Sequence, residues 1–260
     1  MSTESKELAA KASGFDSKKA FDLLLNNALY ILMIIAVIVI QVINPNFLKP
    51  SSLVNILSQT AAYLPLALGI AGCIVLTGTD LSAGRCVGLT ACISASLLQA
   101  VTTSNKMWPE IGTLPIPVVI VVAMVIGAAI GAFNGFFVAK FKLHPFIVTL
   151  GTQLILYTFL LLYVQQGNNK GMAISNLDKS YTDFVKGEMF NIGGASVPWY
   201  VLYAVILTFV MWFIWNKTKF GKNMFALGSN EEAARVSGVN VFLTTVMVFA
   251  LAGAMYGFTG

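Results

Sequence analysis

Seven stretches of the chain are long, apolar and free of charged residues, and short polar segments separate them. Lipid offers no hydrogen bonds to a bare backbone, so apolar stretches of this length are expected to be helices that cross a membrane. The sequence lacks the short alternating runs that build a membrane β-barrel. We therefore predict an all-α, polytopic transmembrane helical bundle. The seven stretches are Leu23–Ile43, Leu53–Thr79, Cys86–Val101, Leu114–Ala139, Pro145–Val164, Val197–Trp215 and Val241–Gly260.

Composition supports a membrane protein and excludes a soluble domain. Hydrophobic residues make up 57% of the 260 positions and charged residues only 10%, whereas ordinary soluble domains have about 25% charged residues. We expect residues 1–22 to be a basic tail, and residues 23–260 to form one transmembrane domain of about seven spans with a polar loop at residues 216–240.

The formal net charge of +5 is informative about orientation. Basic residues collect in cytoplasmic loops, and a cytoplasmic N-terminus places eleven of the sixteen basic residues on that side. The opposite orientation reverses this ratio. We therefore predict a multi-pass membrane protein with its N-terminus in the cytoplasm and no nucleic-acid partner.

Two of the predicted spans have unusual features. Leu53–Thr79 contains Pro65, so we expect an interfacial helix followed by a kinked or broken span. Gly127, Gly131 and Gly135 are spaced four apart, a pattern that lets another helix backbone approach closely. We interpret these glycines as helix-packing residues.

The sequence contains no pattern of an enzyme, a metal site or a cofactor site. It has no phosphate-binding G-x-x-x-x-G-K-[ST] loop, and its three cysteines lack metal-ligand spacing. The single histidine, His144, is read as an interfacial residue. We therefore expect a protein without catalytic residues, metal or cofactor, and any ATP hydrolysis would belong to a partner.

Two polar segments remain as functional candidates. In Thr77–Gly88, Asp80 either caps the following helix or pairs with Arg85, or the segment lines a solute pathway. In Asn216–Asn240, Ser229 and Glu232 have the spacing of a capping box, and Gly238 is placed to end the helix. That short helix is either a turn between spans or a docking element for a cytoplasmic partner.

The chain resembles the permeases of ABC importers. Glu232-Ala233-Ala234 followed by Gly238 is similar to the EAA loop, through which such permeases dock on their ATP-binding subunit. Other stretches resemble the sugar-importing (ribose and galactose) branch of that group, and the likeness runs from about Asn46 to Gly260. These stretches are GTDLSAG from Gly78, Asn134-Gly135, PFIVTLGT from Pro145 and FGKN from Phe220.

The resemblance implies a type II importer-like fold in a bacterial inner membrane. It also implies a permease homodimer, a cytoplasmic ABC ATPase subunit and a periplasmic galactose/glucose-binding protein. It implies galactose or a methyl galactoside as solute, with ribose or xylose as alternatives. Family members continue beyond the position of Gly260, so we expect a chain truncated at that end. An ion-coupled sugar transporter and a non-transporting scaffold are the rival hypotheses.

The resemblance also assigns roles to individual residues. The outer segment Gln165–Ser196 would either face the binding protein or be a flexible connector. The expected ATPase-coupling residues are Ser229, Glu231, Glu232, Ala233, Ala234 and Gly238. The candidate residues of the translocation path are Asp80, Ser82, Gly84, Arg85, Asn134, Thr149 and Thr152.

Overall fold

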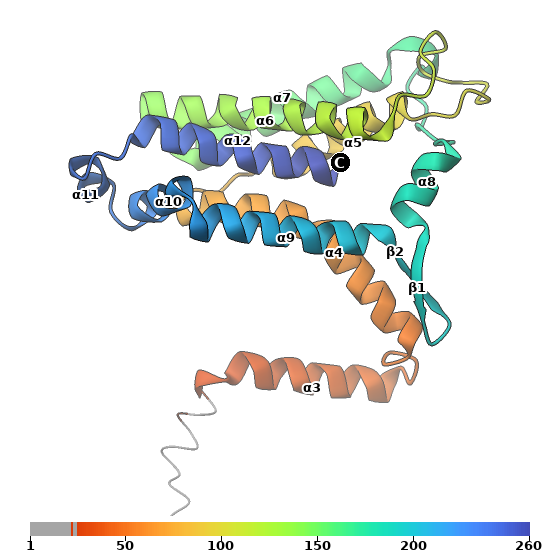
Figure 1. Cartoon of the computed structure of the whole chain (residues 1–260), viewed down its shortest axis with the longest axis horizontal. Helices are drawn as coiled ribbons and strands as arrows, with labels where there is room; N and C mark the ends of the chain where they lie inside the picture. Colours follow the sequence, from red (N-terminus) through yellow and green to blue (C-terminus); the bar gives the residue numbers. More distant parts are fainter. Residues whose placement is uncertain (1–21, 23–24) are drawn as a thin grey trace, which may run out of the picture. The chain divides into compact units, whose positions relative to one another are not determined.

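The structure, a computed structural model, describes residue 22 and residues 25–260 (Figure 1). The predicted basic tail therefore lies almost entirely outside the described residues. The chain divides into two compact units, one ending at Leu53 and one beginning at Val54. In the first unit, α3 (Ala28–Ile43) is apolar along its whole length and has no buried residue, as expected of a helix whose surroundings are lipid.

The second unit is a bundle of apolar helices. α4 (Pro50–Val75) begins in the first unit and continues into the bundle. Every apolar stretch predicted from the sequence contains a helix, so the all-α prediction is confirmed. Within the part of the chain that the structure describes, five helices are long and apolar enough to cross a membrane, and α3 and α5 are shorter. The remaining bundle helices are α5 (Ala83–Leu97), α6 (Ile116–Phe141), α7 (Pro145–Val164), α9 (Trp199–Lys217) and α12 (Val241–Thr259).

The prediction for the second apolar stretch was partly wrong. α4 is one helix that continues through Pro65, so the separate interfacial helix and the broken span are contradicted. Figure 1 shows this helix bent along its length, as the alternative of a kinked span predicted. Proline removes one hydrogen bond from a helix, and Pro65 is buried among the neighbouring helices of the bundle. The break in the chain comes after α4, at residues 76–82.

Figure 1 shows the bundle helices running side by side, so that their connections gather at two ends. At one end, called the α11 end, α4, α6 and α9 finish and α5, α7 and α12 begin. Two short helices lie there, α10 (Lys219–Ser229) and α11 (Glu231–Val236). The sequence predicted only one helix in this loop.

The opposite end, called the hairpin end, has regular structure that the sequence analysis missed. It contains a short 3-10 turn, η1 (Gly167–Asn169), and α8 (Lys179–Lys186). The antiparallel strands β1 (Glu188–Ile192) and β2 (Ala195–Pro198) follow. Gly193 and Gly194 both have positive φ angles in the tight turn between them, which glycine adopts without a steric penalty.

α12 is the central helix of the bundle. Half of its apolar window is buried, against 17–22% for the other four long helices. Phe249, Ala252 and Tyr256 of α12 join a core cluster with residues of α4, α5 and α7. The other long helices therefore present most of their apolar surface outwards, as expected in lipid.

Candidate functional site

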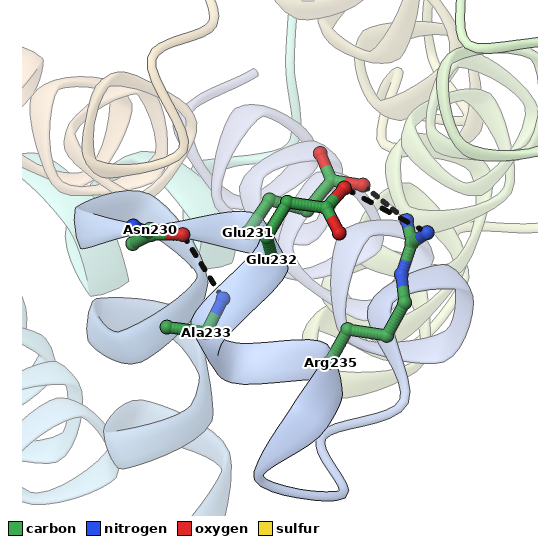
Figure 2. Close-up of polar contacts among 5 residues, drawn as sticks. All are labelled: Asn230, Glu231, Glu232, Ala233 and Arg235. Carbon is green, nitrogen blue, oxygen red and sulfur yellow. Dashed lines mark hydrogen bonds and ion pairs between the residues drawn. The ribbon is translucent and has the colours of Figure 1, made fainter.

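The cap of α11 is one residue later than the sequence predicted. The side-chain oxygen of Asn230, not that of Ser229, accepts a hydrogen bond from the Ala233 backbone N–H at 2.9 Å (Figure 2). Ser229 ends α10, and its hydroxyl donates to the carbonyl of Phe225. The predicted capping box at Ser229 is wrong. Asn and Ser are equally good N-cap residues, and the sequence has one directly after the other, at positions 229 and 230.

The two acidic residues of α11 pair with a basic residue of the same helix. Arg235 lies 2.6 Å from a carboxylate oxygen of Glu231 and 3.9 Å from one of Glu232 (Figure 2). All three side chains are largely exposed, so these pairs add little to stability. Gly238 follows the helix with φ +83°, and its N–H bonds to the carbonyl of Arg235.

α11 fixes one face to the bundle and exposes the other. Ala233 and Ala234 lie on the helix, and Ala234 is buried. On the outer surface, Glu232 has a side chain that is 81% exposed. Val236 is 89% exposed, the highest value among the exposed large hydrophobic side chains of the described residues. The sequence analysis did not single out Val236, because one valine in a polar loop has no distinguishing pattern.

Four of the seven candidate path residues form one buried hydrogen-bonded chain, and a fifth, Thr149, bonds to the backbone beside it. We call these five residues the polar junction. The Ser82 hydroxyl donates to Asp80 at 2.6 Å, and the Asn134 amide donates to Ser82 at 2.9 Å. The Thr152 hydroxyl donates to the Asn134 side-chain oxygen at 2.6 Å. Thr149 accepts from the Leu81 N–H at 3.1 Å. The junction consists of Asp80, Ser82, Asn134, Thr149 and Thr152, all buried.

The two other candidates, Gly84 and Arg85, lie outside this junction. Both are exposed, and the Arg85 guanidinium lies 4.5 Å from the ring centre of Tyr157. The predicted pairing of Asp80 with Arg85 is therefore not formed. Asp80 does not cap α5 either, because its Oδ1 accepts from the N–H of Ser82, before the first helical residue.

The three predicted packing glycines of α6 lie against α12, in a contact we call the glycine seam. A Cβ atom at Gly127 would collide with the carbonyl oxygen of Gly253, and one at Gly131 with that of Phe249. A Cβ at Gly135 would lie 2.8 Å from the Cα of Val246. α12 contributes its own glycines, Gly253 and Gly257, also four apart, a signal that the sequence analysis overlooked.

The described residues hold no group of three or more His, Cys, Asp or Glu side chains that could bind a metal ion. His144 caps α7 through its Nδ1 atom, which accepts from the Phe146 N–H at 3.4 Å. Cys73, Cys86 and Cys92 are free thiols, the first two buried. This chemistry offers packing and capping groups rather than ligands.

The two ends of the bundle differ in charge. The α11 end has seven basic side chains against three acidic ones, those of Asp80, Glu231 and Glu232. The basic ones are those of Arg85, Lys140, Lys142, Lys217, Lys219, Lys222 and Arg235. The hairpin end has four basic side chains, at positions 106, 170, 179 and 186, and four acidic ones, at positions 110, 178, 183 and 188. Only the α11 end carries an excess of positive charge.

Comparison with known proteins gives a consistent result. Residues 52–260 match the family described as the permease component of branched-chain amino acid transport systems. The chain is 43% identical to the galactose/methyl galactoside import permease protein MglC of Haemophilus influenzae and 42% identical to that of Escherichia coli, in each case over 95% of this chain and 73% of the relative. No solved structure matches.

The ribose import permease protein RbsC of Haemophilus influenzae is 32% identical over 89% of this chain and 66% of its own length. The matched region begins within α4 and includes the polar junction, the glycine seam and α11. The chain is a multi-pass membrane protein, and on these matches it belongs to this family of transport permeases.

Proposed function

We propose that this chain is the membrane-spanning subunit of an ATP-driven importer for galactose or a methyl galactoside. The similarity to two galactose/methyl galactoside import permeases supports the choice of solute. A neutral sugar is bound through hydroxyl and amide groups, and the polar junction supplies both. ATP hydrolysis belongs to a separate cytoplasmic subunit, and this subunit is not itself an enzyme.

The observation that carries this proposal is α11. Its capped N-terminus, its exposed Glu232 and its exposed Val236 form a short rigid projection at the end of the bundle with excess positive charge. Basic residues favour the cytoplasmic side of a membrane. We assign residues 216–240 as the loop that docks on the ATPase, with Glu231, Glu232, Ala233, Ala234 and Gly238 in α11 and its end.

The remaining partners follow from this orientation. The hairpin end would face the periplasm, where a galactose/glucose-binding protein would deliver the sugar to the segment 165–196. A second copy of the permease would complete the transport path, because the outward apolar surfaces of the long helices leave room for a helical partner. ATP binding would move α11, and the bundle would then change which side its cavity opens to.

The substitution Val236→Glu tests the docking assignment. A charge at the centre of a buried interface removes an apolar contact and adds a desolvation cost, so we expect the ATPase to bind about tenfold more weakly or worse. Galactose uptake should fall with it, while membrane insertion stays intact. The measurements are co-purification of the ATPase with a tagged permease and uptake of labelled galactose.

The matched control is Val236→Thr, which keeps the shape of the side chain and should have a much smaller effect. Full ATPase binding and uptake in Val236→Glu would contradict the docking role. So would labelling of residues 229–238 from the periplasmic side of intact cells.

An ion-coupled transporter is the second candidate, because Asp80 is an ionisable residue buried in the bundle. Uptake that survives loss of the ATPase and collapses with an uncoupler would favour it. Uptake that requires the ATPase and persists with an uncoupler would exclude it.

A further inference from the structure

A cleft of about 660 Å³ opens at the α11 end of the bundle. Glu231 and Arg235 of α11 line one part of it, and Leu76 and Thr77 line another. These last two residues begin the non-helical segment Leu76–Ser82 between α4 and α5. The cleft therefore connects the proposed docking helix with the break in the chain.

The segment Leu76–Ser82 is held by a small number of replaceable bonds. Thr77 has a positive φ angle of 56°, which is uncommon for a non-glycine residue. The N–H of Leu81 bonds to the Thr149 hydroxyl of α7, and that hydroxyl donates to the carbonyl of Thr79 at 3.2 Å. Backbone groups that bond to side chains of another helix can separate without unwinding either helix.

Two polar atoms in the bundle core lack hydrogen-bond partners. The described residues contain three buried side-chain polar atoms of this kind, and two of them are Asp80 Oδ2 and the Tyr256 hydroxyl. Asp80 is 4% exposed and Tyr256 is 1% exposed. The two groups face each other and the Cys73 thiol across contacts that are too long or too poorly aligned for ordinary hydrogen bonds, so each is the other's nearest weak polar partner. Buried polar groups without partners are rare and costly, so a partner in another conformation is a physical explanation for this pair.

The break also touches the docking loop directly. A Cβ atom on Gly228 of α10 would collide with the carbonyl oxygen of Val75, the last residue of α4. Backbone therefore meets backbone at this point, without a flexible side chain between them. A displacement of the loop is passed to the end of α4, and from there to Leu76–Ser82.

We propose that Leu76–Ser82 is a gate between the cleft and the sugar path, and that Asp80 Oδ2 and the Tyr256 hydroxyl bind sugar hydroxyl groups when this gate opens. The inference rests on the proposed function. In the conformation described here the gate is closed, because every residue of the polar junction is buried. Opening exposes hydrogen-bonding atoms that the hydroxyl groups of a sugar satisfy.

The chemistry at this point suits a neutral polyol. No basic side chain forms an ion pair with Asp80 among the described residues, and Arg85 lies over the ring of Tyr157 instead. Asp80 Oδ2 is an acceptor, and the hydroxyl of Tyr256 both donates and accepts. A sugar hydroxyl can donate to Asp80 Oδ2, and it can either donate to or accept from the Tyr256 hydroxyl. Neither group therefore needs a cation as its partner.

Thiol labelling during transport tests the gate. The permease, with its ATPase and binding protein, is reconstituted with the nucleotide side accessible to a membrane-impermeant thiol reagent. Ser82→Cys should show no labelling beyond the wild type at rest and clear labelling during ATP turnover by the complex, whether or not the variant still transports galactose. The matched control is Ser96→Cys, at a serine near the far end of α5 that is also buried. This cysteine should stay unlabelled in both conditions.

Thr152→Cys serves as the second variant should Ser82→Cys not assemble. The gate is wrong if the complexes hydrolyse ATP while both cysteines stay as protected as the one at position 96. Labelling of all three during transport would also overturn it, because that result means general loosening. Failure of the wild-type complex to transport galactose with ATP would instead count against the proposed function, before any variant is compared.

The sugar contact is tested with Tyr256→Phe. Free galactose should slow the labelling of Ser82→Cys during ATP turnover. Adding Tyr256→Phe removes one hydrogen bond to the sugar, so the galactose concentration that halves the labelling rate should rise about 2- to 10-fold. Tyr163→Phe is the control, because it removes a hydroxyl that bonds to Ser96 at 2.6 Å, away from the junction. Equal half-protection concentrations in the wild type and in both tyrosine variants would overturn the contact.

Discussion

The glycine seam and the polar junction join helices of the same bundle in different ways. The seam uses direct contact between backbones, and the junction uses hydrogen bonds between side chains. At the seam, Gly131 brings the backbone of α6 against the carbonyl of Phe249, and no side chain stands between them. At the junction, Asn134, one turn further along α6, joins the break and α7 through its amide group. A contact between backbones has one close-packed arrangement, whereas hydrogen bonds can be exchanged for others. The comparison suggests that α6 and α12 move as one body and that the break moves against them.

The substitution Gly131→Ala should have the largest effect. Its Cβ atom meets the main chain of α12, which cannot rotate away as a side chain can, so we expect the free energy of unfolding to fall by at least about 3 kcal/mol. Unfolding of the purified protein by a denaturing detergent measures it. Gly151→Ala is the control, because nothing lies within 4 Å of a Cβ there and alanine is the better helix former. Equal stability of the two variants would show that the seam is not closely packed.

The next effect is expected at Asn134→Leu. The substitution leaves the Thr152 hydroxyl without its acceptor and removes one of the two side-chain partners of the Ser82 hydroxyl. A buried group left unsatisfied costs about 1–3 kcal/mol. Adding Thr152→Val should recover part of this loss, with a coupling energy of about 0.5–3 kcal/mol in a double-mutant cycle. Strictly additive effects would contradict a connected junction.

The smallest effect is expected at Thr149→Val, at the edge of the junction. The variant loses two longer bonds to the backbone of the break, of 3.1 and 3.2 Å, so we expect a loss of about 1 kcal/mol. Hydrogen exchange at the Leu81 amide should become faster while exchange in α12 does not change. A loss as large as that of Asn134→Leu would mean that the break is as rigid as the seam.

The helices could be predicted from the sequence because lipid provides no hydrogen-bond partners, so the backbone of an apolar segment must form its hydrogen bonds internally. The hairpin was missed because β1 and β2 are short and β1 is mostly exposed, and local turn chemistry, not hydrophobicity, produces them. The break predicted at Pro65 does not form, because the packing of this buried proline outweighs the hydrogen bond that it removes from α4. Local propensity decides less where tertiary contacts are dense.

The candidate site residues show the same division. Five polar residues could be selected because polar side chains are conspicuous in a charge-free bundle, and the structure brings them together. Tyr256 could not be selected, because a tyrosine in an apolar helix is an ordinary packing residue until its hydroxyl is seen without a partner. The cap shifted from Ser229 to Asn230, because both residues satisfy the same sequence rule and only the geometry chooses between them.

The central place of α12 has a consequence for how the protein is made. Its partners in the seam lie on α6, far earlier in the chain, and synthesis delivers α12 after every other helix of the bundle described here. Until α12 is made, the glycine face of α6 lacks its partner helix. Lipid or an insertion factor must cover this face in the meantime. Contacts between distant segments form slowly. The rate at which newly made protein becomes resistant to protease should therefore follow the arrival of this one helix.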